Sequence, residues 1–236
     1  MNDKTLIKKR FQKSINSYSN NALIQKKMAE KLLSLINKNN FKNIFEIGSY
    51  SGVLTKNAIE KFDFESYLAL DIINSFDYIK NLSPKISFIQ DDIENFKTNQ
   101  KFDLILSNAS LQWCNDFSSV IKKIKSFLNE NGILLISIFQ EDNFFEIKKS
   151  FNMGLKYPKE DEILNLFSKN VKFFKEEYSI QFENSFELIR HLKNTGVNAL
   201  NKNQISISEF KKGLKILNDV YQNKITYKPL YILDFK

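Results

Sequence analysis

The chain has little cysteine, few arginines and no long apolar segment. Its one cysteine, Cys114, excludes an internal disulfide framework and a cysteine-built zinc cluster, so we expect a packed thiol and no metal. No run of 18 apolar residues occurs, and Met1-Asn2-Asp3-Lys4 leads into no apolar signal core. We therefore expect a soluble, cytoplasmic protein.

The net charge of +8 and the pI near 9.3 suit an anionic partner. The lysines are scattered along the chain, however, and a nucleic-acid site is better supported by clustered arginines with interleaved aromatic residues. The charge thus permits an acidic partner without identifying one, and it gives little support to nucleic-acid binding.

Apolar periodicity predicts helices over 6–18 and 22–36 and then a series of alternating strands and helices. We expect Asp116 to N-cap a helix that ends at Asn131-Gly132. This alternation indicates an α/β fold with a doubly wound, mostly parallel sheet. Its five predicted strands lie near 44–47, 66–71, 86–90, 102–107 and 133–138.

The segment after residue 138 has a different pattern, which we interpret as a helical cap on one single domain. A strand is predicted over 177–182, and helices over 185–194 and 208–222, the second opened by a capping box of Ser206 and Glu209. The final strand covers 227–235, and Pro229 suggests that its pairing begins near Leu230. The predicted division is N-terminal helices 1–40, core 41–138, cap-forming insertion 139–205, and final helix and strand 206–236.

The stretch 41–71 is the first candidate for a ligand site. Glu46 and Gly48 follow a short apolar run, Gly52 comes four residues later, and Asp71 closes the next strand 19 residues past Gly52. A carboxylate at about that distance meets ribose hydroxyls in nucleotide-binding βαβ units. The spacing Gly-x-x-x-Gly differs from the dinucleotide fingerprint, and an acid at the strand end favours a ligand with a cationic amino group. An ordinary strand–turn–helix is the alternative.

This motif resembles the Glu/Asp-x-Gly-x-Gly-x-Gly signature of methyltransferases that use S-adenosylmethionine (SAM), with Tyr50 in place of the middle glycine. The resemblance implies SAM as the cofactor. It also implies that the acid after the third strand holds the adenine amino group, for which Asp92 fits better than Asp91. The implied cofactor-binding residues are Glu46, Gly48, Ser49, Gly52, Asp71, Ile72, Asp92, Ile93 and Asn108.

Further stretches resemble one family of these enzymes, the malonyl-acyl-carrier-protein O-methyltransferases of biotin synthesis. The segment after strand four reads Leu-Ser-Asn-Ala-Ser-Leu-Gln-Trp over 106–113, and the cap helix reads Leu-Ile-Arg-His-Leu-Lys-Asn-Thr-Gly-Val-Asn-Ala over 188–199. Arg10-Phe11 with Tyr18 and Gln25, and the closing stretch 225–231, agree with the same family.

The family implies a Rossmann-like, seven-stranded sheet and transfer of the SAM methyl group to the free carboxylate of malonyl-acyl carrier protein. The methyl ester would start pimeloyl and biotin synthesis. Arg190 is the first candidate for the cation that binds the carboxylate, followed by His191 and Lys193, while Tyr18, Gln112 and Trp113 would close the pocket over the methyl group. We expect a monomer whose basic surface docks the acidic carrier protein, with no nucleic acid and no membrane as partners.

Other interpretations stay open at this point. Tyr18 and Trp113 could be core residues, and Arg190 and His191 could be structural. The acceptor could be a free small acid. Tyr50 could block the cofactor site, which would leave a non-catalytic SAM-binding or interaction module. Methylation of RNA has less support, because the chain lacks the Asn/Asp-Pro-Pro-Tyr type motif after strand four.

Overall fold

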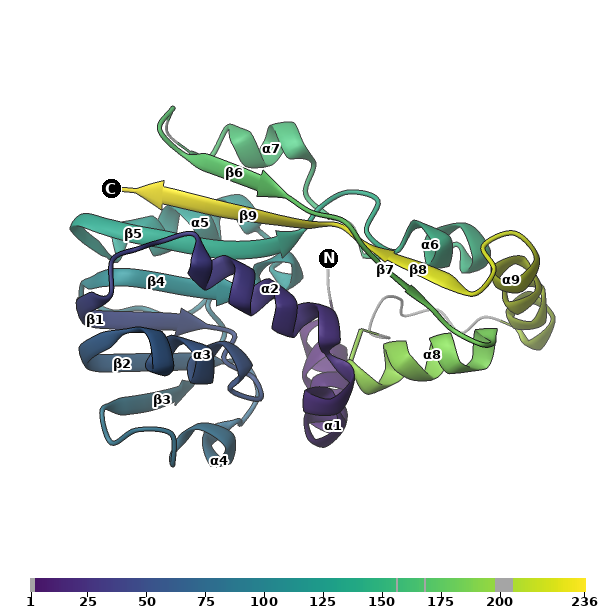
Figure 1. Ribbon diagram of the computed structural model, residues 1–236, viewed down its shortest axis with the longest axis horizontal. Coiled ribbons are helices and arrows are strands. Elements are labelled where there is room, and N and C mark those ends of the chain that lie inside the picture. Colours follow the sequence, from purple (N-terminus) through teal and green to yellow (C-terminus); the bar gives the residue numbers. More distant parts are fainter. Residues whose placement is uncertain (1–2, 156, 168, 198–205) are drawn as a thin grey trace.

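Seven strands form one sheet in the order β3-β2-β1-β4-β5-β9-β6. The computed structural model describes residues 3–155, 157–167, 169–197 and 206–236 (Figure 1). Pairing is parallel from β3 through β5, and β9 runs antiparallel to both β5 and β6. The strands of this sheet are β1 (Asn40–Ile47), β2 (Asp63–Asp71), β3 (Ile86–Gln90), β4 (Phe102–Asn108), β5 (Leu128–Phe139), β6 (Lys172–Lys175) and β9 (Pro229–Phe235).

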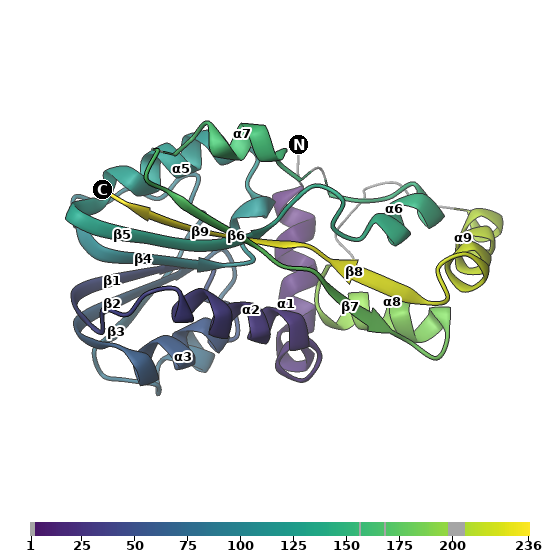
Figure 2. The ribbon, with the colours of Figure 1, turned by 45° about the horizontal axis from the view of Figure 1, so that its top comes forward.

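Helices cover both faces of the sheet. Figure 2 shows α5 and α7 on one face and α2 and α3 on the other. The predicted doubly wound, mostly parallel α/β sheet of seven strands is therefore confirmed. The helices are α1 (Lys4–Asn21), α2 (Leu23–Ser34), α3 (Val53–Lys61), α4 (Phe76–Ile79), the 3₁₀ turn η1 (Leu111–Trp113), α5 (Phe117–Ser126), α6 (Phe145–Phe151), α7 (Glu160–Leu164), α8 (Ser185–Asn194) and α9 (Ile207–Asp219).

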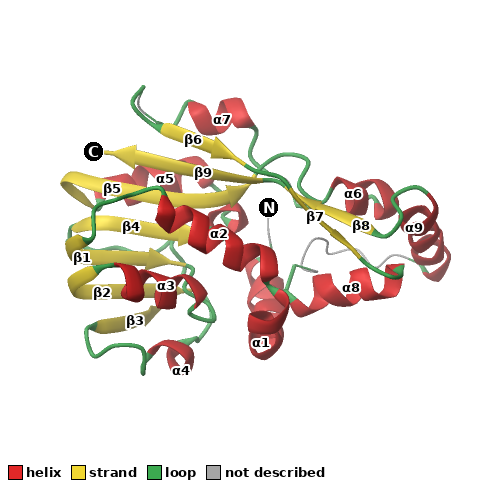
Figure 3. Cartoon of the chain, in the orientation of Figure 1, coloured by secondary structure: helices red, strands yellow, loops and turns green. Residues whose placement is uncertain are grey.

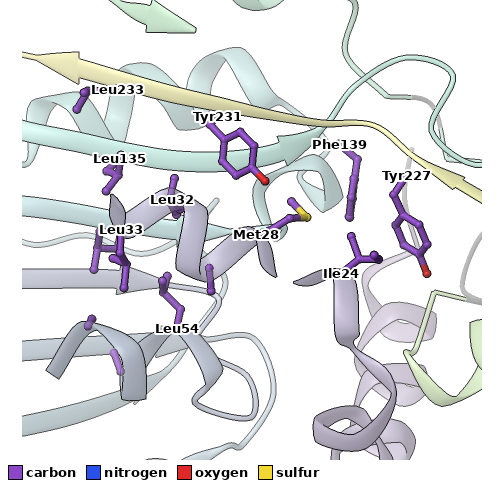
Figure 4. Close-up of a cluster of buried hydrophobic side chains, with 14 of the residues drawn as sticks. Ile24, Met28, Leu32, Leu33, Leu54, Leu135, Phe139, Tyr227, Tyr231 and Leu233 are labelled. Carbon is purple, nitrogen blue, oxygen red and sulfur yellow. The ribbon is translucent and has the colours of Figure 1, made fainter. Parts of the chain in front are cut away.

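Alternation of side chains along the strands divides the core into two clusters, one on each face. Ile44 and Leu135 pack with Met28 and Leu32 of α2 in one cluster, part of which Figure 4 shows. Phe45, the sequence neighbour of Ile44, packs with Ile105 and with Ile121 and Ile124 of α5 in the other. Near-continuous apolar runs in the central strands follow from burial on both faces.

A smaller layer extends from the sheet. The strands β7 (Tyr178–Gln181) and β8 (Lys224–Tyr227) pair antiparallel in a sheet of their own, and α6, α8 and α9 surround them (Figures 1 and 3). Figure 1 shows α1 standing between α8 and the carboxyl ends of the parallel strands. The division of the chain into four segments stays a prediction, and Asn198-Ala199 of the cap-helix motif lie outside the described residues.

Two helix starts were predicted correctly. The Asp116 side chain accepts the N–H of Ser119 at the start of α5, and Ser206 and Glu209 form the capping box of α9. Among the helices of the described residues, none combines the length and the apolar character that a membrane crossing requires.

Two predicted boundaries were wrong. The helix after Asp116 ends at Ser126, because Leu128 already pairs with Phe102 at the start of β5. Asn131, with φ of +61°, and Gly132 lie within β5 next to a shift in register, so they mark an irregularity in a strand and no helix end. The last strand, predicted over 227–235, is β9 and starts two residues later, at Pro229, while Tyr227 ends the separate strand β8. The prediction that pairing begins near Leu230 is confirmed, since the first pair is Pro229 with Phe139.

Truncation of the core under α2 tests this packing. Leu32 is fully buried and labelled in Figure 4, so Leu32→Ala should lower the free energy of unfolding by about 2–5 kcal/mol through lost burial and a residual cavity. Glu30→Ala on the exposed side of the same helix should change it by less than about 0.5 kcal/mol. Urea unfolding of the three proteins measures both effects, and equal stabilities would contradict the packing described.

Candidate functional site

Two adjoining cavities lie at the carboxyl ends of β1, β2 and β4, and we call them together the strand-end cleft. The empty space in them, counted together with the solvent at their mouths, is about 390 and 490 Å³. Ligands of open α/β sheets bind at this edge, where β1 connects to neighbours on opposite sides. Both cavities are lined by Ile7, Gly48, Asp71, Ile72, Ser110 and Trp113.

Gly48 forms the floor of the cleft at the end of β1. Its φ of +79° lies in the left-handed region, and a Cβ placed on it would come within 2.1 Å of Ser110 Oγ. Its backbone N–H donates to the carbonyl of Leu70 over 2.7 Å, which fixes the turn against β2. Only glycine therefore brings the backbone this close to the loop after β4.

Asp71 organises the loops around the cleft from the end of β2. One carboxylate oxygen accepts the backbone N–H of Tyr50 at 2.8 Å, and the other accepts that of Ile73 at 2.9 Å. Burial raises the pKa of Asp71 to about 6, although these N–H groups stabilise its ionised form. The carboxylate is thus held in place by the backbone, while its residue lines both cavities of the cleft.

Tyr50, where the methyltransferase signature has its middle glycine, connects the turn to α1. Its hydroxyl donates to the carbonyl of Phe11 at 2.8 Å and shares a hydrogen bond with Ser14 Oγ at 2.9 Å. Its ring meets those of Phe11 and Tyr18 edge-on, with centroids 5.4 and 4.4 Å apart. The side chain forms part of the wall, and the larger cavity persists beside it.

The apolar stripe of α1 covers the cleft. Ile7 and Phe11 line it, and Lys4 at the start of the helix pairs with Asp92 at 3.2 Å and with Glu94 at 2.5 Å. The periodicity of α1 identified this stripe as buried, but nothing in the periodicity showed that it faces a cavity. These α1 residues, with Ser110 and Cys114, are site residues that the sequence reasoning missed.

Glu46 lies beneath the cleft and does not line it. One of its carboxylate oxygens accepts the hydroxyls of Thr55 and Tyr67, each at 2.6 Å, and the other oxygen is buried without a partner. Burial raises the pKa of Glu46 to about 7, more than these two hydrogen bonds lower it. Glu46 therefore joins β1 to α3 and β2 from inside the sheet.

The cofactor residues expected from the sequence fall into two sets. Glu46, Ser49 and Gly52 do not line the strand-end cleft, and Gly52 instead begins α3 with φ of +75°. Both Asp91 and Asp92 line it, which resolves the alternative between them by including both. The expected residues that do line the cleft are Gly48, Asp71, Ile72, Asp92, Ile93 and Asn108.

A third and smaller cavity adjoins the cleft, and we call it the inner cavity. It shares Phe11, Tyr18, Ala109 and Trp113 with the larger cavity of the cleft, so these residues lie between the two. The other residues that line it are Gln25, Gln112, Phe139, Tyr157, Thr195 and Val197. It contains three of the expected catalytic residues: Tyr18, Gln112 and Trp113.

Arg190 and His191 of α8 are not brought to these cavities. The Arg190 side chain is exposed, and His191 Nε2 shares a hydrogen bond of 2.6 Å with the Tyr227 hydroxyl. Burial lowers the pKa of His191, and its ring packs 5.2 Å from that of Phe182. The structure therefore separates the expected cations from the expected Tyr18, Gln112 and Trp113.

A wider groove opens to solvent beyond the inner cavity, and we call it the outer groove. It measures about 960 Å³ and runs between the loop before α5 and α7. Gln112 and Tyr157 line both spaces, so these two side chains separate the inner cavity from the outer groove. Within the described ranges, no cluster of three or more His, Cys, Asp or Glu side chains is placed to hold a metal ion.

Known proteins with similar sequences cover nearly the whole chain. The profile of a family described as "Methyltransferase domain" matches residues 21–200. A malonyl-(acyl-carrier protein) O-methyltransferase of Calditerrivibrio nitroreducens is 32% identical over 96% of this chain and 94% of its own. One of the same name from Chlorobium luteolum is 28% identical over 98% and 95%.

The fold is also found among solved structures. The N-methyltransferase NodS of Bradyrhizobium japonicum, in complex with S-adenosylhomocysteine, superposes with a TM-score of 0.58. It covers 96% of this chain and 97% of its own, at 13% sequence identity. At that identity the likeness concerns the fold alone.

The Gly48 turn gives a direct test of the cleft. Gly48→Ala should weaken SAM binding by at least about tenfold, because the added Cβ meets Ser110 and the left-handed conformation disfavours alanine. Calorimetric titration with SAM measures the loss. Gly154→Ala is the matched control, since its Cβ would find no heavy atom nearer than 3.8 Å, and its affinity should equal that of the wild type. Unchanged affinity in Gly48→Ala would contradict a ligand at this turn.

Glu46 should make stability depend on pH. Its carboxyl keeps its proton in the folded state up to about pH 7, while the unfolded chain releases it near the ordinary pKa of 4.5, so stability falls as the pH rises between these values. Glu46→Gln replaces the carboxyl group with an amide, which does not titrate. The variant should equal the wild type in stability near pH 4.5 and exceed it by about 3 kcal/mol at pH 8. Urea unfolding at both pH values decides, and a difference independent of pH would contradict the raised pKa.

Proposed function

The chain belongs to the methyltransferase domain family and, within it, to the malonyl-(acyl-carrier protein) O-methyltransferases, and on that basis we propose its reaction. It transfers the methyl group of SAM to the free carboxylate of a malonyl group carried on acyl carrier protein, and the methyl ester enters biotin synthesis. The observation that carries the proposal is a cleft fit for the cofactor that adjoins an inner cavity, in a chain with near-full-length relatives of this name.

The residues of the strand-end cleft fit SAM. The backbone at Gly48 leaves a space that any Cβ would fill, and the carboxylates of Asp71 and Asp92 are acceptors for hydroxyl and amino groups. The apolar side chains of Ile72 and Ile93 lie where a flat ring would pack. When bound, SAM supplies a methyl group attached to positively charged sulfur.

The protein's own part in the reaction is to position the acceptor and exclude water. A carboxylate with an ordinary pKa of about 4 is ionised at pH 7, so no side chain has to remove a proton from it. Tyr18 and Trp113 line both the cleft and the inner cavity, which supports a role for them in holding the acceptor in line with the methyl group. Phe11 and Phe139 contribute apolar surface to the inner cavity.

The outer groove suits an acceptor that arrives on another protein. An acyl group on a carrier is attached through a long flexible arm, which has to lie in an open channel while its end is enclosed. The outer groove leads to Gln112 and Tyr157, which also line the inner cavity. The exposed Arg190 and Lys193 of α8 belong to the basic surface that attracts an acidic carrier protein. The monomeric state, the cytoplasmic location and the absence of nucleic-acid and membrane partners stay predictions from the sequence.

Intact-mass spectrometry of malonyl-acyl carrier protein, incubated with SAM and the purified protein, tests the reaction. A gain of one methyl group is expected, because the acceptor carries a free carboxylate. Acetyl-acyl carrier protein, which has no carboxylate, is the matched control and should keep its mass.

Two results would contradict this proposal. Methylation of free malonate with none of the carrier-bound form would identify a methyltransferase for small acids. No methylation of any carboxylate, together with SAM binding, would leave a binding module or a different acceptor.

A further inference from the structure

Two glutamines of the inner cavity have hydrogen-bonding groups that nothing in the described structure uses. Gln25 of α2 and Gln112 of η1 are each 4% exposed, and the Oε1 atom of each is buried without a partner. Buried polar atoms are nearly always hydrogen-bonded, and each exception costs about 1–3 kcal/mol. Because both side chains line the same cavity, the unused groups indicate a polar ligand there.

Gln112 is held through its side-chain amide, and Gln25 is held through its backbone carbonyl. The Nε2 atom of Gln112 donates one hydrogen to the carbonyl of Ala109 at 2.7 Å, which leaves its second hydrogen for a ligand. The backbone of α2 at Gln25 accepts the Asn108 side-chain amide at 2.9 Å. Asn108 therefore fixes Gln25 relative to the end of β4, where the cleft and the inner cavity meet.

No charged side chain is among the residues that line the inner cavity. Three cations that could bind a carboxylate do not line it: Arg190 is exposed on α8, Lys4 is paired with Asp92 and Glu94, and Arg10 of α1 has a buried Nε without a partner. The cavity instead carries hydroxyl groups and amides. Burial raises the pKa of both Tyr18 and Tyr157, so their hydroxyls stay neutral at every pH at which the protein works.

We propose that the acceptor carboxylate is bound in the inner cavity by neutral hydrogen-bond donors, chiefly the Gln25 amide, and by no cationic side chain. This inference rests on the proposed carboxyl methylation. An amide turned by half a turn about its last bond exchanges its oxygen and nitrogen in the same space, so Gln25 presents its NH₂ group to an anion.

Neutral donors suit this reaction better than a cation. The carboxylate oxygen forms a bond to the methyl carbon while the bond from that carbon to sulfur breaks, and the carboxylate loses its negative charge as it becomes an ester. An arginine would stabilise the anion of the ground state more than the transition state, and the barrier would rise. Neutral donors orient the carboxylate and lose less as its charge disappears. The site thereby selects an anionic acceptor only when the positively charged cofactor is present.

Gln25→Glu puts a negative charge where the proposed donor stands. We expect kcat/KM for malonyl-acyl carrier protein at pH 8 to fall by at least about 100-fold relative to the wild type. As the pH is lowered to about 5.5, the buried new carboxyl gains a proton, and the ratio of variant to wild-type activity should rise by at least about tenfold. The dissociation constant of SAM, measured by calorimetry, should stay within about twofold.

Two further variants complete the test. Gln12→Glu makes the same change at an exposed position of α1 and should behave as the wild type at each pH. Gln25→Leu keeps the volume without a charge, so it should raise KM for the acceptor at least about tenfold while SAM still binds. If Gln25→Glu does not fold, KM of Gln25→Leu decides, and its melting temperature shows whether that variant is folded.

The results separate this inference from the proposed function. Near-wild-type kcat/KM in either Gln25 variant would overturn the inference, and so would a loss that is equal at every pH and accompanied by lost SAM binding, which indicates a structural role. If the wild type methylates no carboxylate at all, the proposed function has failed, and the inference fails with it.

Discussion

The buried carboxylate of Asp71 is the constraint on which the rest of the site depends. It accepts one backbone N–H from the turn after β1 and one from the turn after β2, so two loops that are distant in sequence have one fixed arrangement. Tyr50 in the first of these turns is in turn hydrogen-bonded to α1. The position of the helix that covers the cleft therefore follows from a carboxylate at the end of β2. Its raised pKa shows that burial costs free energy, which the two N–H groups only partly offset.

The strand-end cleft is acidic and the inner cavity is uncharged, and each suits the groups that it has to bind. Asp71, Asp91 and Asp92 line the strand-end cleft, where hydroxyl groups and amines need acceptors. The inner cavity is apolar apart from hydroxyls, amides and one indole. An acidic side chain there would repel a carboxylate, and a basic one would hold it too firmly in the ground state. Tyr18 and Trp113 lie at the boundary between the two regions, since they line both.

The sequence predicted the parallel sheet well because its signals are local. Apolar runs, the helix caps at Asp116 and Ser206 and the glycine turn at Gly48 each depend on a few neighbouring residues. The strand predicted over 177–182 is found as β7, whereas the short strands β6 and β8 were missed because pairing between distant segments decides them. Asn131-Gly132 was wrongly predicted to end a helix for the same reason. Such a pair can end a helix or kink a strand, and only the pairing of Leu128 with Phe102 shows that it lies in a strand.

The site was predictable in part, and the errors concern which space a side chain faces. Periodicity shows that a side chain is buried or exposed but not what it faces, so Phe11 was expected to pack and Glu46 to bind, whereas Phe11 lines the cleft and Glu46 lies beneath it. Arg190 was expected at the carboxylate because the chemistry called for a cation. Arg190 is instead exposed on the surface, where a positive charge can attract an acidic partner over long range and in a salt-dependent way. An uncharged cavity is compatible with that arrangement, since attraction of the partner and alignment of its carboxylate are separate tasks with opposite demands on charge.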